Sequence, residues 1–160
     1  MLWLACAPPL DPETCSVGID IGDCAPAFAL QDETAQWVER AAFDGAPLVV
    51  EFGAMWCHNC QEMAGELEAL SQDGYAVLMV LFEDTGGGPP EPGDAALWAE
   101  HFGLSHPVLV DPGADVSRTW NFSGNIPETY LIDEDGLIRW RHVGATGRLR
   151  QNVERALGRP

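Results

Sequence analysis

The stretch LVVEFGAMWCHNC, residues 48–60, joins a nearly continuous apolar run to two cysteines that are separated by two residues. An apolar run like residues 48–53 is typical of a strand that is buried on both faces. In the residues that follow, apolar side chains recur at spacings of four and three, which predicts an amphipathic helix over about residues 57–71. The cysteine pair is therefore expected at the junction of a buried strand and a helix.

This position gives the two cysteines different chemistry. The first lies at a helix N-terminus, where unpaired backbone N–H groups and the helix dipole favour a thiolate. We therefore assign Cys57 as the nucleophile and Cys60, one turn later, as the thiol that resolves a mixed disulfide. Half of a zinc site is an alternative for a C-x-x-C pair, but structural zinc needs four ligands, and His101, His106 and His142 show no paired spacing. No metal is therefore expected.

The rest of the chain alternates between strand and helix patterns. Strands are expected near residues 28–30, 37–38, 75–82 and 107–111, and helices near 94–102, 114–120 and 146–157. Asp94 is the expected N-cap of its helix, and residues 83–93 before it are expected to form a loop. Residues 129–133 and 137–141 flank an Asp-Gly turn, which predicts a hairpin. The pattern indicates an α/β sheet with parallel strands that ends in an antiparallel pair.

Length and charge limit the possible functions. The 160 residues suit one domain, expected at residues 18–160 after a tether or signal remnant at residues 1–17, and the protein is expected to be a monomer. The net charge is -17 and all eight basic residues are arginine. Such a chain repels phosphate backbones, which argues against nucleic-acid binding. The acidity indicates either solubility or attraction to a basic partner.

Three further cysteines, Cys6, Cys15 and Cys24, lie near the N-terminus. Ala5-Cys6 resembles the end of a bacterial lipoprotein signal, and the proline-rich residues 7–12 resemble a tether. A disulfide between Cys15 and Cys24 would leave Cys6 for a lipid anchor. We therefore expect an extracytoplasmic, periplasmic location, with the frayed end of a cytoplasmic protein as the alternative. No segment reaches the roughly 18 apolar residues needed to span a membrane.

Three motifs carry a resemblance to a known family. EFGAMWCHNC, residues 51–60, resembles the active-site segment of thioredoxin-like proteins. GNIPETYLID, residues 124–133, resembles their second motif, and GDCAPAFAL, residues 22–30, resembles the entry segment of the TlpA/ResA/DsbE-like branch. The likeness spans residues 18–157 with the motifs in order. It implies an α/β thioredoxin fold, in which helices flank a central mixed β-sheet, with an N-terminal extension.

The resemblance also implies roles for individual residues. Pro127 would be the family's cis-proline facing the disulfide, which exposes the backbone of Ile126 to an incoming peptide. Glu51 would relay a proton to or from Cys60, and Trp56 would shield one side of the site. Without the resemblance, Pro127 could be an ordinary turn proline and Glu51 an edge-strand carboxylate facing solvent.

Two positions depart from the family pattern. Gly53 replaces a common aromatic residue, so a looser base of the site is expected. The dipeptide His58-Asn59 lacks the proline seen in many members. A protonated His58 close to Cys57 would stabilise the thiolate and make the protein more oxidising.

The expected function is reduction of disulfides in extracytoplasmic client proteins, without a cofactor. An upstream redox partner would restore the dithiol of Cys57 and Cys60. One alternative is a disulfide donor or isomerase that uses the same residues in the other direction. Another is a binding module in which the two cysteines form only a structural disulfide or a metal-delivery site.

Overall fold

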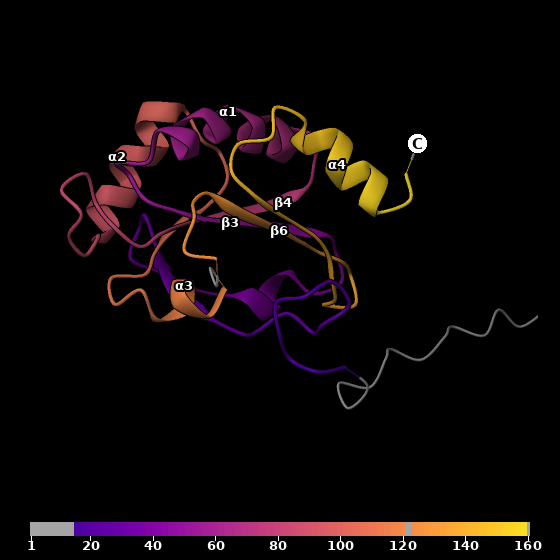
Figure 1. The fold of residues 1–160 in the computed structure, drawn as a ribbon. Coiled ribbons are helices and arrows are strands. Elements are labelled where there is room, and N and C mark those ends of the chain that lie inside the picture. The colour runs from indigo at the N-terminus through magenta and orange to yellow at the C-terminus, as the bar shows by residue number, and fades with distance from the viewer. Residues whose placement is uncertain (1–14, 121–122, 160) are drawn as a thin grey trace, which may run out of the picture.

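The computed structural model describes residues 15–120 and 123–159, which form a seven-stranded mixed sheet covered by helices on both faces. The strand order is β2-β1-β5-β4-β3-β6-β7. Figure 1 shows α1, α2 and α4 on one side of the sheet and α3 on the other. The expected α/β thioredoxin-like architecture is confirmed. The expected lipid anchor at Cys6 and most of the predicted tether lie outside the described residues.

The strands and helices follow the order that the sequence predicts. The strands are β1 (Ala29–Asp32), β2 (Trp37–Glu39), β3 (Leu48–Gly53), β4 (Ala76–Leu81), β5 (Val108–Val110), β6 (Glu128–Ile132) and β7 (Ile138–Val143). The helices are α1 (His58–Gln72), α2 (Pro92–Phe102), α3 (Asp115–Trp120) and α4 (Leu149–Ala156), with a 3-10 turn, η1 (Arg40–Phe43).

Strand β3 lies inside the sheet, parallel to β4 and antiparallel to β6. All six of its residues are buried, which explains the apolar run in the sequence. Alternate side chains point to opposite faces. Val49 belongs to the core beneath α1, α2 and α4, whereas Val50 and Phe52 belong to the core around Trp120 of α3.

The N-terminal segment is attached to the edge of the sheet formed by β7. A disulfide joins Cys15 to Cys24, as the sequence analysis suggests. Cys24 bridges Leu137, and Gly22 N–H donates to the carbonyl of Ile138 in β7 (2.8 Å). The start of this edge strand, at Ile138, is therefore paired with the chain's own N-terminal loop.

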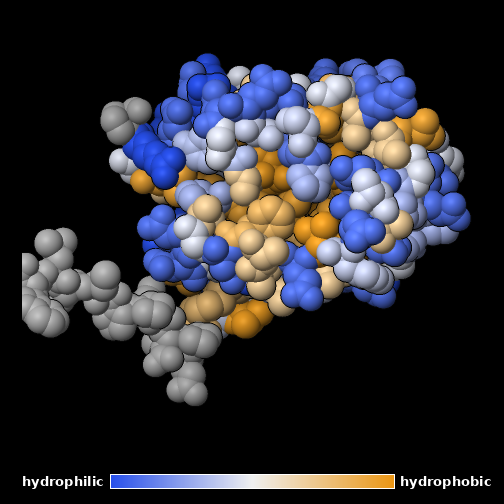
Figure 2. Space-filling view, turned by 180° about the vertical axis from the view of Figure 1, so that it is seen from behind, coloured by the Kyte–Doolittle hydropathy of each residue, from blue (hydrophilic) through white to orange (hydrophobic). Residues whose placement is uncertain are grey.

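Figure 2 shows one face on which apolar side chains gather in a central band bordered by hydrophilic ones. No helix in residues 15–120 and 123–159 is long and apolar enough to cross a membrane.

The N-cap prediction for α2 is wrong by three residues. Glu91 is the N-cap, and Asp94 stands at the third helical position. The Asp94 carboxylate accepts from the Glu91 N–H (2.8 Å), and the Glu91 side chain accepts from the N–H of Asp94, so the two form a reciprocal capping box. Pro92 belongs to the first turn of α2 and not to the predicted loop, because proline is favoured in the first helical turn as well as in loops.

We expect Asp94→Ala to lower the free energy of unfolding by about 1 kcal/mol, because it leaves the Glu91 N–H without its side-chain acceptor. Urea unfolding measures this change. The control is Glu100→Ala, which removes an exposed acid near the C-terminus of the same helix and is expected to be neutral or slightly stabilising. Equal stability of the Asp94 variant and the wild-type protein would contradict the capping assignment.

Candidate active site

The cysteine pair lies where β3 passes into α1. Cys57 is the N-cap of α1, and its Sγ accepts a hydrogen bond from the Cys60 N–H (3.1 Å). The two sulfurs form a disulfide, with Cα atoms 5.2 Å apart. A sulfur at this position faces the unpaired N–H groups of the first helical turn, which stabilise a thiolate once the bond is reduced.

The two cysteines differ in exposure. Cys57 is 5% exposed and Cys60 is 0% exposed. An external thiol or disulfide therefore reaches Cys57 first, and Cys60 can react only with a sulfur already bound to Cys57. This asymmetry supports the assignment of Cys57 as nucleophile and Cys60 as resolving thiol.

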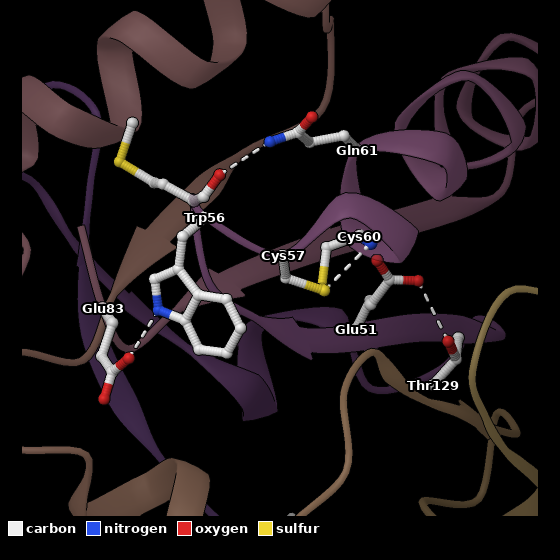
Figure 3. Close-up of a disulfide and its surroundings, with 8 residues drawn as sticks. Glu51, Trp56, Cys57, Cys60, Gln61, Glu83 and Thr129 are labelled. Carbon is white, nitrogen blue, oxygen red and sulfur yellow. Dashed lines mark hydrogen bonds between the residues drawn. A yellow bond between two sulfur atoms is a disulfide. The ribbon is translucent and has the colours of Figure 1, made fainter. Parts of the chain in front are cut away.

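Glu51 is fully buried on β3, and the alternative of an edge-strand carboxylate facing solvent is wrong. Glu51 and Gly53 point to the same face of β3, the face on which Cys60 packs. Oε2 of Glu51 accepts from the hydroxyl of Thr129 (3.0 Å), while Oε1 is buried without a hydrogen-bond partner. Figure 3 shows the carboxyl group beneath the start of α1, beside Cys60.

This environment changes the acidity of Glu51. Burial raises the pKa of its carboxyl group to about 8; the Thr129 hydrogen bond opposes this rise, and the nearby Glu66 adds to it. No lysine occurs in the chain to neutralise the charge. The carboxyl group is therefore protonated at neutral pH and titrates in the range where a thiol exchanges its proton.

Gly53 does not leave the base of the site loose. A Cβ atom at this position would lie 2.7 Å from Sγ of Cys60 and 3.0 Å from Cε of Met79. These two side chains therefore fill the space above the glycine. The expectation of a looser base is wrong, because Cys60 packs directly on the backbone of β3.

Trp56 lies beside the disulfide and is half exposed. Its indole N–H donates to Oε2 of Glu83 (2.6 Å), and the Met55 N–H donates to the carbonyl of Glu83 (3.0 Å). Figure 3 shows the indole between the disulfide and Glu83. The first residue of the predicted loop 83–93 thus holds the ring in place, a role that no sequence signal indicated.

His58 lies on the exposed surface of α1. Its Nε2 pairs with Glu62 (3.2 Å), and both side chains are mostly exposed. The stabilisation of the Cys57 thiolate by His58 stays a prediction, since the contact that the structure gives the imidazole is this pair with Glu62. An exposed pair of this kind contributes little to stability.

Pro127 follows a cis peptide bond from Ile126, as predicted from the second motif. In the register of β3 and β6, Phe52 pairs with Glu128, so Pro127 stands opposite Gly53. Ile126 packs against the core cluster that contains both cysteines. The structure thus brings the two predicted peptide-binding residues to the cysteine pair.

A groove lies between α2 and Met55, the residue before Trp56. Its volume is about 680 Å³, and it is lined by apolar and polar residues, among them Met55, Gln61, Leu97 and His101. Leu97 is 60% exposed. In the described part of the chain, no three His, Cys, Asp or Glu side chains gather as a metal site.

Comparison with known proteins agrees with this geometry. The model of the AhpC/TSA family matches residues 21–141. The chain belongs to the AhpC/TSA family. Within that family it is similar to the thiol:disulfide interchange protein HelX of Rhodobacter capsulatus, with 31% identity over 126 residues, 77% of this chain and 68% of that protein.

Other relatives are of the same kind. DsbE of Vibrio cholerae, a thiol:disulfide interchange protein, is 29% identical over 78% of this chain, which spans 65% of DsbE. ResA of Geobacillus kaustophilus, a thiol-disulfide oxidoreductase, is 26% identical over 87% of this chain and 77% of ResA. This family member is therefore a thiol–disulfide oxidoreductase of the thioredoxin-like, DsbE/ResA-like group.

Solved structures give the same result. A DsbE candidate from Chlorobium tepidum aligns with a TM-score of 0.71 and 27% identity, covering 88% of this chain and all of that chain. The peroxidoxin BcpB of Mycobacterium tuberculosis aligns with a TM-score of 0.72 and covers 88% of this chain and 97% of its own. At 17% identity, BcpB supports the fold alone. The relatives of the DsbE and ResA type indicate, in general terms, an extracytoplasmic location and thiol–disulfide exchange with redox partners or client proteins.

We expect Glu51→Gln to stabilise the oxidised protein at alkaline pH. The unfolded carboxyl group ionises near pH 4.5 but the folded one only near pH 8, so wild-type stability falls as pH rises between these values. At about 1.4 kcal/mol per pKa unit, the variant gains up to roughly 5 kcal/mol above pH 8 and almost nothing at pH 4. Urea unfolding at both pH values measures the difference.

The control for this prediction is Glu39→Gln, which changes an exposed carboxylate and is expected to leave both measurements unchanged. If Glu51→Gln changed stability equally at pH 4 and pH 9, the raised pKa would be contradicted.

We expect Gly53→Ala to destabilise the oxidised protein by about 1–3 kcal/mol, because the new Cβ would overlap Sγ of Cys60. Gly65→Ala is the matched control. Gly65 is an exposed residue of α1, and no atom lies within 4 Å of a Cβ added there, so the substitution is expected to be neutral or stabilising. Chemical denaturation measures both. Equal stability of the two variants would show that Cys60 does not pack on Gly53.

Proposed function

We propose that the protein reduces disulfides of extracytoplasmic client proteins through Cys57 and Cys60. The observation that supports this most strongly is the disulfide at the start of α1, whose first cysteine is slightly exposed and whose second is fully buried near the carboxyl group of Glu51. A purely structural disulfide needs neither this asymmetry nor the acid. The relatives named for thiol:disulfide interchange support the same chemistry.

The reaction begins from the reduced dithiol. The Cys57 thiolate attacks one client sulfur, a mixed disulfide forms, and the other client sulfur leaves as a thiolate. With a pKa of about 8, Glu51 is ionised in a fraction of the molecules; there it takes the proton from the Cys60 thiol, and the Cys60 thiolate then attacks Sγ of Cys57. The second client sulfur leaves, and protons restore both client thiols. Two electrons pass from the protein to the client, and an upstream redox partner returns them.

Client binding would use three surfaces beside Cys57. The backbone of Ile126, next to Pro127, offers groups that pair with an extended peptide. Trp56 covers the opposite side, and the groove lined by Leu97 can accept an apolar side chain. The net charge of -17 favours clients with basic segments.

The N-terminal end of the sequence supports a membrane-tethered, periplasmic location for a monomeric protein. Ala5-Cys6 resembles a lipoprotein acylation site, and the Cys15–Cys24 disulfide is of a kind that persists in oxidising compartments. A lipid at Cys6 would keep the domain close to membrane-bound redox partners.

Insulin reduction by dithiothreitol tests the proposed function. We expect the wild-type protein to accelerate precipitation of the insulin B chain, and Cys57→Ser to abolish the acceleration because it removes the attacking sulfur. Cys60→Ser should accumulate a mixed disulfide at Cys57, detected by non-reducing electrophoresis and mass spectrometry. The two serine variants are matched controls for each other. If wild type and Cys57→Ser accelerated the reaction equally, the proposal would fail.

A further inference from the structure

Glu128 comes directly after Pro127, and its carboxylate is completely buried. Oε1 accepts from the Tyr130 hydroxyl (2.8 Å) and from Nη2 of Arg141 (3.1 Å), and Oε2 accepts from the Ser123 hydroxyl (3.1 Å). Ser123 and Glu128 bracket the segment that contains Ile126 and Pro127. One buried carboxylate therefore holds both ends of the segment that faces the cysteine pair.

Arg141 is the cation of this cluster. A buried carboxylate is costly unless a cation and hydrogen bonds compensate for its lost hydration, so the orientation of Arg141 matters for Glu128. Its other terminal nitrogen, Nη1, donates to Oδ1 of Asp20 (3.1 Å) and to the carbonyl of Ile19 (3.4 Å). The guanidinium group thus lies between the buried Glu128 and the N-terminal loop.

The N-terminal loop is closed by a covalent bond. The Cys15–Cys24 disulfide joins its ends, and the Cys24 N–H donates to the carbonyl of Ser16 (2.9 Å). The Ile138 N–H donates to the carbonyl of Asp23 (3.0 Å), which attaches the loop to β7, the strand of Arg141. The closed loop, residues 15–24, therefore fixes the place of Ile19 and Asp20 over Arg141.

We infer that the closed loop 15–24 is a positioning element for the peptide-binding segment 123–127, acting through Asp20, Arg141 and Glu128. This inference rests on the proposed function, because it assigns the segment to client binding. The disulfide keeps Asp20 and Ile19 on Arg141, Arg141 holds the Glu128 carboxylate, and that carboxylate holds the segment opposite Gly53. Opening the loop is expected to weaken client binding without altering the exchange chemistry of Cys57 and Cys60.

The test uses the oxidised protein, in which both disulfides are intact, and follows reduction of Cys57–Cys60 by mass spectrometry of alkylated peptides. One reductant is a dithiol peptide, which can pair with the backbone of Ile126; the other is dithiothreitol, which cannot. For Cys15→Ser/Cys24→Ser, we expect the peptide reaction to slow about two- to tenfold. The cause is weaker binding, seen as a higher peptide concentration at half-saturation. The rate with dithiothreitol and the potential of the Cys57–Cys60 couple should be unchanged.

Asp20→Asn tests the same path without removing a covalent bond, since the Asp20 side chain is 84% exposed. It should slow the peptide reaction in the same way, and its effect should not add to that of the double serine variant, because both act through Arg141. Arg139→Gln is the matched control on β7, because Arg139 pairs with Asp133 and not with Glu128.

Two results would overturn the inference alone: variants that react with the peptide like wild type, or variants slowed equally with the peptide and with dithiothreitol. A wild-type protein that reacts with neither reductant would overturn the proposed function, and the inference with it.

Discussion

The packing of the Cys60 sulfur on the backbone of β3 at Gly53 is the contact on which the site depends. It fixes the first turn of α1 against the sheet, so that Cys57 becomes the N-cap and the outer of the two sulfurs. The same contact closes the space above Glu51 and shields its carboxyl group from solvent. Reactivity at Cys57 and acidity at Glu51 are therefore two consequences of one buried junction.

Glu51 is unusual because no cation compensates its carboxyl group within residues 15–120 and 123–159. A buried carboxylate is normally paired with a cation, and Arg141 forms this ion pair with the buried Glu128. At Glu51 the only hydrogen-bond donor is the neutral hydroxyl of Thr129 among the residues that the structure describes. Glu51 therefore avoids the cost of burial by taking up a proton, which makes it suited to exchange one with Cys60.

Sequence reasoning succeeded where the signal was local. The bounds of β3 and α1 follow from the apolar run and the helical spacing around residues 48–72, and the Asp-Gly turn located the hairpin of β6 and β7. The family motif located Pro127 and Glu51. These features depend on neighbouring residues or on a pattern that many proteins share.

The remaining features depend on contacts between distant parts of the chain. Trp56 and Glu83 are 27 residues apart, and Asp20 and Arg141 are 121 residues apart. Neither pair has a spacing that a single sequence can reveal. The effect of His58 on the Cys57 thiolate stays a prediction, because the ion pair that the structure gives His58 is with Glu62.

The most direct test of the central claim is a redox titration of Cys57–Cys60. The purified protein would be equilibrated with dithiothreitol buffers and quenched by alkylation, and the cysteine pair would be quantified by mass spectrometry. We expect a two-electron transition near the potential of thioredoxin, about -270 mV. A pair that stays oxidised below about -300 mV would instead be a structural disulfide and would contradict the account.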